Sequence, residues 1–181
     1  MIHKFTLAVS QAFQKKGYLV HQPCRIPEIR SSLYVQTTEP IRLGFAKVLD
    51  HFLFIDADDS VFDRPDLLKE IYKRFSAQVN LGFKTPHALR ILIPNIAIVA
   101  VSKTGFSEEM LSFARTSSLE PWYGGEAGQV ILVDLAREQI VSLVSHSNGR
   151  YPRPGAIPLL HASNCIRKIC QEAFAQIKLD E

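Results

Sequence analysis

Ile96-Ala-Ile-Val-Ala-Val101 is an unbroken apolar run, and Val130-Ile-Leu-Val133 is a second one. Runs this short and this rich in β-branched residues are typical of strands that are covered on both faces. Between them, a turn over residues 102–105 leads into Ser107-Glu-Glu-Met-Leu-Ser-Phe-Ala114, where Ser107 is a suitable N-cap for a helix. A strand, a helix and a second strand in this order predict an α/β domain. No stretch of the chain carries a decisive catalytic motif.

The pattern on either side of these runs extends the same fold. Periodicity predicts helices over about residues 2–16, 65–80 and 159–177, and strands over about residues 18–21 and 33–35. Residues 45–55 predict either a pair of strands or one long bent strand. Pro94-Asn95 predicts a tight turn between a short strand at 89–93 and the strand that starts at Ile96, and Arg137-Glu138 predicts a hairpin. We therefore expect residues 1–181 to form a single α/β (or α+β) domain, with a central mixed sheet flanked by about four helices. The topology of residues 22–44 stays open, because three prolines interrupt the periodicity there.

The composition indicates an ordinary soluble protein. The chain has 181 residues, of which 46% are hydrophobic and 22% are charged, and its formal net charge is +3. That length suits one domain. The charge excess is too small by itself to indicate nucleic-acid binding, although a local basic patch is compatible with it. No apolar stretch approaches the ~18 residues that span a bilayer, and the N-terminal residues lack the apolar core of a signal peptide. We expect no membrane partner.

The cysteines favour a reducing compartment. Cys24, Cys165 and Cys170 are an odd number with no Cys-x-x-Cys spacing. This argues against a disulfide framework or a zinc knuckle, so we expect reduced thiols in a cytoplasmic protein with no cofactor. His161 and Cys165 are four residues apart on the last predicted helix. Because no second pair accompanies them, a helix-start histidine and a buried thiol are favoured over two zinc ligands.

The densest acidic stretch is Asp56-Ala-Asp58-Asp59-Ser60. An EF-hand counted from Asp56 needs glycine at its sixth position and glutamate at its twelfth, where this chain has Val61 and Leu67. We interpret the stretch as a solvated loop before a helix, where carboxylates suit the N-terminal dipole, with a looser metal site as the alternative. Gly124-Gly125-Glu126-Ala127-Gly128 precedes a strand and lacks the lysine of a Walker motif, so it predicts a flexible turn.

Two groups of side chains are better candidates for a surface that binds a partner. Arg150, Tyr151 and Arg153 lie in one polar loop, and arginines interleaved with an aromatic residue hold phosphates and stack on bases. Trp122 and Tyr123 lie beside glycines, and if exposed they would anchor a protein partner. The alternatives are a solvated loop for the first group and a plug at one end of the sheet for the second.

Val99-Ala-Val-Ser102, Gly105-Phe-Ser-Glu-Glu109 and Ile131-Leu-Val-Asp134 follow one another in the second half of the chain. In these three segments the chain resembles the endonuclease-like fold of the PD-(D/E)XK superfamily, especially its Mrr-type members. The resemblance implies a restriction-endonuclease-like sheet. The span from Asp50-His51-Phe52 to Phe106-Ser107 is also similar to a small uncharacterised bacterial family of cyanobacterial type, from which no activity follows.

The chain departs from that superfamily where the chemistry lies. The superfamily needs an acidic residue on one strand and Glu/Asp-x-Lys on the next, which hold magnesium and activate a water. The predicted strands at 89–93 and 96–101 contain no carboxylate, Val101 stands where the acid belongs, and Lys103 is the only lysine near. The resemblance therefore implies a catalytically inactive relative or a shared fold alone.

Three functions are compatible with these residues. The first is a non-catalytic regulatory module that binds a protein or nucleic-acid partner through the two candidate surfaces. The second is a magnesium-dependent nuclease that assembles Asp50, Asp56, Asp58, Lys103 and Glu126, whose carboxylates would then converge within roughly 4–6 Å. The third is a homodimer that uses a sheet edge or an exposed stripe of the last helix as its subunit contact.

Overall fold

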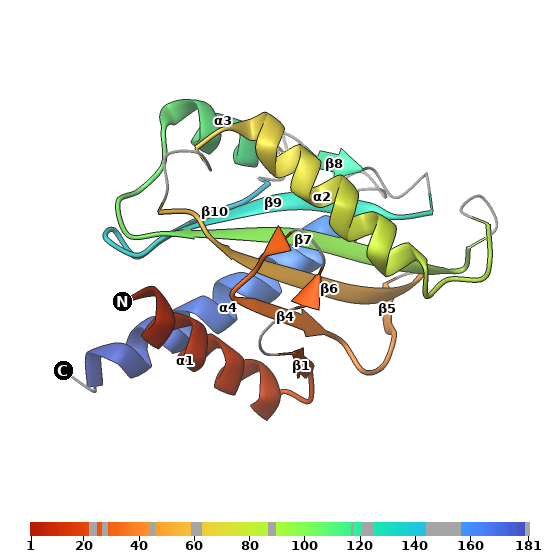
Figure 1. Cartoon of the computed structure of the whole chain (residues 1–181). Helices are drawn as coiled ribbons and strands as arrows, with labels where there is room; N and C mark the ends of the chain where they lie inside the picture. The colour runs from red at the N-terminus through yellow and green to blue at the C-terminus, as the bar shows by residue number, and fades with distance from the viewer. Residues whose placement is uncertain are drawn as a thin grey trace, which may run out of the picture.

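The fold is an α/β arrangement of three layers, a mixed sheet between two pairs of helices (Figure 1). The computed structural model of the chain describes residues 1–21, 25–26, 29–43, 46–58, 63–86, 90–116, 118–120, 125–143 and 157–179. Helices α1 (Ile2–Lys15) and α4 (Ile157–Leu179) cover one face of the sheet, and α2 (Pro65–Asn80) and α3 (Glu108–Thr116) cover the other. None of the helices in the described part of the chain has the length and hydropathy needed to cross a bilayer.

Eight strands of the described residues form one sheet, in the order β1-β4-β6-β7-β9-β10, with β5 paired to β6 and β8 paired to β9. The strands are β1 (Leu19–His21), β4 (Leu33–Gln36), β5 (Ile41–Leu43), β6 (Ala46–Asp56), β7 (Leu92–Ser102), β8 (Ser118–Glu120), β9 (Ala127–Asp134) and β10 (Gln139–Val141). A separate two-stranded pair joins β2 (Arg25–Ile26) to β3 (Ile29–Arg30). Strands β6, β7 and β9 are parallel, and the other pairs are antiparallel. The predicted mixed sheet flanked by four helices is confirmed, whereas its endonuclease-like character stays a prediction.

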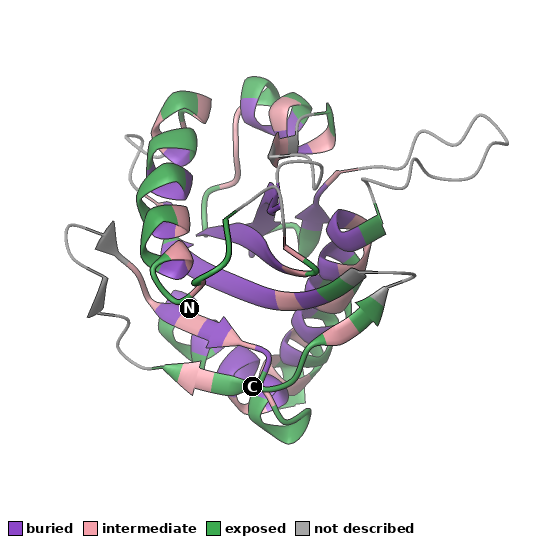
Figure 2. Ribbon diagram, turned by 90° about the vertical axis from the view of Figure 1, so that its right-hand side faces the viewer, coloured by how far each residue is buried: buried purple, intermediate pink, exposed green. Residues whose placement is uncertain are grey.

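The central strands are buried on both faces because a helical layer covers each side, and Figure 2 shows most of their length as buried. Successive residues point to opposite faces of a strand. On β6, Phe52 therefore faces α1 and α4, whereas Leu53 faces α2 and α3. On the face that Phe52 occupies, Phe5 of α1 and Ile169 of α4 belong to the same buried apolar cluster. This two-sided burial accounts for the unbroken apolar runs in the sequence.

The predicted turn at Pro94-Asn95 is wrong, because β7 continues through both residues. Leu49 of β6 lies opposite Pro94, whereas pairing with β9 begins only at Asn95. At Pro94 the strand has a neighbour on one side, so a missing N–H is tolerated there. Pro94-Asn95 is a local signal for a turn, but the long parallel pairing of β7 with β6 keeps these two residues in the strand.

The predicted flexible turn over residues 124–128 is also wrong at its end, because Gly128 lies inside β9. A Cβ atom on Gly128 would collide with the phenol ring of Tyr72, which reaches it from α2. The glycine therefore provides room for a buried ring rather than a bend in the chain. Gly125, which does adopt a positive φ of 78°, is the turn residue.

Candidate functional site

A row of buried polar side chains crosses the sheet beneath the start of α4. Asp50, Asn95 and Gln129 come from β6, β7 and β9, and all three are fully buried. Asp50 lies opposite Asn95 in the parallel register, and Asn95 Nδ2 donates a hydrogen bond of 2.7 Å to Asp50 Oδ1. Such a row is costly unless its members bond to one another or to a covering element.

Helix α4 supplies further partners of this row, while Asn95 Oδ1 has no hydrogen-bond partner among the described residues. Asn95 Nδ2 also donates to the backbone carbonyl of Pro158 at 2.9 Å, and Gln129 Nε2 donates to the carbonyl of Leu159 at 2.7 Å. Ser163 Oγ donates to Gln129 Oε1 at 2.9 Å. The first turns of α4 are therefore fixed to the sheet by hydrogen bonds as well as by apolar packing.

The second oxygen of Asp50 faces His161. Asp50 Oδ2 lies 3.3 Å from His161 Nδ1, and both atoms are buried. The close contact with Asp50 and its charge raise the pKa of His161, against the lowering effect of partial burial. The His161 side chain is 31% exposed, and because Nδ1 is buried this exposure belongs to the rest of the ring.

One turn further along α4, Cys165 Sγ lies 3.4 Å from the hydroxyl of Tyr18. Burial raises the pKa of the Cys165 thiol to about 11, and burial likewise raises the pKa of Tyr18 above its usual range. The thiol is therefore protonated at neutral pH, the form that is a poor nucleophile. Lys16 and Lys168 both oppose the pKa shift of Cys165, which places their ammonium groups around this part of the surface.

Positive side chains gather on the exposed positions of α1 and α4. Six basic residues lie in these two helices and at the end of α1: Lys4, Lys15, Lys16, Arg167, Lys168 and Lys178. Glu172 is the single acidic residue in the same described elements, and it pairs with Lys16 at 2.8 Å. We call Lys15, Lys16, Arg167 and Lys168 the basic cluster. The Lys16–Glu172 pair joins the end of α1 to the side of α4 that bears Lys168, and Arg167 lies next along the outer surface of α4.

The opposite helical layer has no such excess. Four basic residues of α2 and α3 accompany four acidic ones: Lys69, Lys73, Arg74 and Arg115 against Asp66, Glu70, Glu108 and Glu109. Lys69 pairs with Asp66 at 3.0 Å, and Arg74 pairs with Glu70 at 2.9 Å. Among the four described helices, the charged residues are thus distributed unevenly between the two layers.

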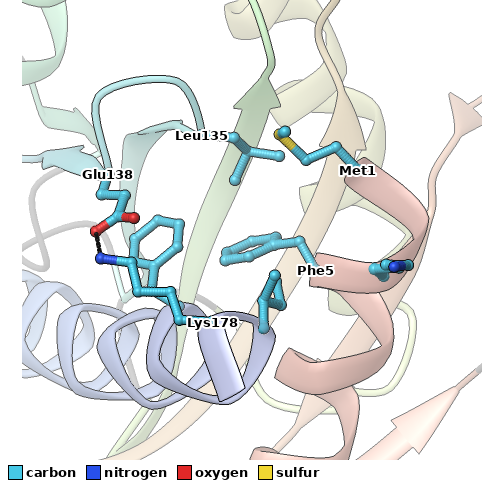
Figure 3. A pocket seen from close by; sticks show the side chains of 8 residues that line it. Met1, Phe5, Leu135, Glu138 and Lys178 are labelled. Carbon is cyan, nitrogen blue, oxygen red and sulfur yellow. Dashed lines mark hydrogen bonds and ion pairs between the residues drawn. The ribbon is translucent and has the colours of Figure 1, made fainter. Parts of the chain in front are cut away.

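A groove with a volume of about 280 Å³ lies between the start of α1, the end of α4 and the β9–β10 turn (Figure 3). Its lining residues are Met1, Lys4, Phe5, Leu135, Glu138, Phe174, Ile177 and Lys178. The Phe5 and Phe174 rings lie 5.2 Å apart and form part of its floor. At one side, Lys178 Nζ bonds Glu138 Oε2 at 2.7 Å. We call this feature the α1–α4 groove.

The five residues of the predicted nuclease site occupy three separate environments. Asp50 lies in the buried row on the α4 face of β6, and Asp56 is six residues further along the same strand, about 20 Å away at the usual rise per residue. Glu126 precedes β9 on the α2 side, where its carboxylate accepts hydrogen bonds from Tyr72, Ser76 and Asn80. The structure therefore does not bring Asp50 and Glu126 to the strand end that bears Asp56.

Asp56, Asp58 and Lys103 do come together, at the carboxyl ends of β6 and β7. Lys103 Nζ lies 2.6 Å from Asp58 Oδ2, and the Lys103 backbone N–H donates to Asp58 Oδ1. The Asp58 backbone N–H donates to Asp56 Oδ1 at 3.1 Å. Among the described residues, no three His, Cys, Asp or Glu side chains are grouped so as to hold a metal ion.

The predicted binding residues Trp122, Tyr123, Arg150, Tyr151 and Arg153 lie outside the described residues, as does Cys24. The stripe named for a homodimer, Ile166, Ile169, Phe174 and Ile177, is turned inward. Its first two residues are fully buried, and the other two pack against the same core. The exposed apolar stripe that would have favoured a dimer through the last helix is therefore absent from α4.

Sequence reasoning missed both the buried polar row and the basic face. The signal for the basic face was present, since Lys4, Lys15, Arg167, Lys168 and Lys178 avoid the apolar stripes of their helices. The basic face was not predicted, because nothing in the sequence showed that these two helices share one side of the sheet. Comparison of the chain with protein-family models, with curated proteins and with solved structures gave no match.

Proposed function

We propose that the chain is a non-catalytic module that binds nucleic acid through phosphate contacts of the basic cluster. The observation that carries this proposal is the separation of charge between the helical layers, with six basic residues against one acidic residue on α1, its C-cap Lys16 and α4. Lysine and arginine neutralise phosphates with little dependence on base sequence. Such a face suits a module that follows the backbone of a nucleic acid.

The availability of these side chains also supports the proposal. Lys15, Arg167 and Lys168 have no ion-pair partner among the described residues, whereas Lys69 and Arg74 of the opposite layer are paired within their own helix. An unpaired guanidinium can contact a phosphate through two parallel hydrogen bonds. Binding through this cluster therefore requires no ion pair to be broken except Lys16–Glu172.

The test is a titration of fluorescently labelled duplex DNA and single-stranded RNA at several salt concentrations. One variant replaces Lys15, Lys16, Arg167 and Lys168 with glutamine. The matched control replaces Lys69, Lys73, Arg74 and Arg115 of the other layer, which removes the same number of positive charges. The wild-type protein is expected to bind with a Kd of roughly 10⁻⁴–10⁻⁶ M near physiological salt, and more tightly as salt is lowered.

The expected result is a loss of at least about tenfold for the cluster variant, and a salt dependence whose slope falls by about three. The control variant should bind nearly as well as wild type. Equal weakening in both variants would mean that net charge rather than this face controls binding. No binding by the wild type would refute the proposal and favour a protein partner, for which Trp122 is the first residue to substitute.

A magnesium-dependent nuclease is a second candidate, favoured by the contact between Lys103 and the Asp56–Asp58 pair. Ligands of α/β sheets commonly bind at the carboxyl ends of parallel strands, which is where these three residues lie. The same titration with and without magnesium would separate the two functions. Cleavage that requires magnesium and disappears in Asp58→Asn, while Asp66→Asn remains active, would replace the non-catalytic reading.

A further inference from the structure

The α1–α4 groove combines an apolar floor with a positively charged mouth. Phe5 and Leu135 are almost completely buried beneath it, and Phe174 and Ile177 are partly buried along its side. In Figure 3, Met1, Phe5 and Leu135 approach the same space from α1 and from the end of β9. A concave site lined mainly by apolar side chains, with a few polar groups at its edge, is typical of small-molecule binding.

The charges at the mouth do not balance. Lys4 and Lys178 both line the groove, as does Met1, and Glu138 is the one carboxylate beside them. Glu138 is bonded to Lys178, whereas Lys4 has no ion-pair partner among the described residues. The Lys4 ammonium group is thus left without a counter-charge next to an apolar surface. A ligand that matches both features has a negative charge and an apolar body.

We infer that the groove binds a small free carboxylic acid with an apolar chain, whose carboxylate pairs with Lys4. The apolar chain lies over Phe5, Phe174 and Ile177, and the flexible thioether of Met1 adapts to its shape. A groove of about 280 Å³ lies near the lower limit of pockets that hold small molecules. A docked protein needs roughly 800 Å² of surface on each partner, so the size of the groove favours a small ligand.

Sodium octanoate is a suitable probe, and the two methionines of the chain provide the reporters. Met1 lines the groove, whereas Met110 is fully buried in α3, in the opposite layer. With the methionine methyl groups labelled with carbon-13, octanoate should shift the Met1 signal saturably and leave the Met110 signal in place. The neutral alcohol 1-octanol, which has the same chain, should bind more weakly because it lacks the carboxylate.

The charge contact is tested with Lys4→Gln, since Lys4 is exposed and its loss should not affect folding. Octanoate should bind this variant about fivefold more weakly, the loss expected for one partly exposed charge pair. Lys73→Gln, an exposed position of α2 in the opposite layer, is the control and should bind as wild type does. No saturable shift at Met1, or equal shifts at Met1 and Met110, would overturn the inference. So would equal binding of octanol and octanoate, or an unchanged affinity in Lys4→Gln.

Discussion

Replacement of His51 by glutamine should remove much of the acid sensitivity of this fold. His51 lies on β6 with 4% of its surface exposed, on the face covered by α2. Its Nδ1 is 2.9 Å from the hydroxyl of Tyr34, and its Nε2 is buried with no hydrogen-bond partner among the described residues. A second proton on the ring would therefore place a charge in a buried site where the Nε2–H has no acceptor among the described residues. Glutamine keeps a polar side chain at this position but does not titrate.

The magnitude follows from the pKa of His51, which burial lowers from 6.5 to about 4. Above about pH 6.5 the ring is neutral in both the folded and the unfolded chain, so the stability is fully present there. As the pH falls towards 4, the unfolded chain takes up a proton that the folded chain does not, and stability is lost. At 1.36 kcal/mol per pH unit, acidification to about pH 5 should cost about 2 kcal/mol through this one residue.

The assay is urea unfolding of wild type and His51→Gln at about pH 7.5 and about pH 5, each followed by far-UV circular dichroism. The variant should be less stable than wild type at the higher pH, because glutamine fills the site less well. The difference in unfolding free energy between the two proteins should shrink by about 2 kcal/mol at the lower pH. All other titrating groups are common to both proteins and cancel from this comparison.

Parallel pH profiles for the two proteins would refute the reasoning. They would mean that His51 takes up its proton in the folded state as readily as in the unfolded chain, so that burial imposes no penalty. His3→Gln is the control, since His3 is exposed on α1. A comparable change in the His3 variant would show that the effect belongs to the overall charge and not to the buried site.

Three further perturbations test the buried contacts. His161→Ala should destabilise by about 1–2 kcal/mol, less than for a fully buried pair because water reaches the ring. Since contact with Asp50 raises the pKa of His161, this loss should be largest below about pH 6.5 and should fade as the pH rises through the raised pKa, as urea unfolding at two pH values would reveal. Gly128→Ala should cost about 1–3 kcal/mol, because its methyl group collides with Tyr72, and a normal melting temperature would contradict this. Glu126→Gln should lower the free energy of unfolding by about 1–3 kcal/mol. The carboxylate accepts hydrogen bonds from three side chains, and the NH₂ group of glutamine would face at least one of these donors. An unchanged thermal midpoint would disprove this.

The helices and buried strands were predictable because each carries a local pattern. The stripe that contains Leu68, Ile71 and Phe75 indicates α2, and Ser107 caps α3 as expected, accepting a hydrogen bond from the Met110 backbone N–H at 3.3 Å. Pro94 was misread because its effect depends on whether a neighbouring strand needs the missing N–H, which is a property of the sheet and not of the segment. Strand β8 was missed for a similar reason. It has only three residues, too few for a periodic pattern, and it is identified by its pairing with β9.

The candidate sites were less predictable because they depend on which elements become neighbours. Asp50 and Asn95 are 45 positions apart, and neither has unusual flanking residues that mark it as part of a buried row. Acidic density drew attention to Asp56 and Asp58, and their contact with Lys103 agrees with a shared strand end. Glu126 looked available in the sequence, whereas in the structure Tyr72, Ser76 and Asn80 all donate to its carboxylate.

The polar row beneath α4 also determines the position of that helix along its own axis. An apolar stripe repeats every turn, so packing alone would tolerate a shift of α4 along its axis by about 5.4 Å. The carbonyls of Pro158 and Leu159 each meet one amide of the sheet, and a shifted helix would leave Asn95 and Gln129 without these partners. Hydrophobic burial thus selects which side of α4 faces inward, and the amides select its translational position. The position of the charges on its outer side relative to those on α1 is therefore set by hydrogen bonds on its inner side.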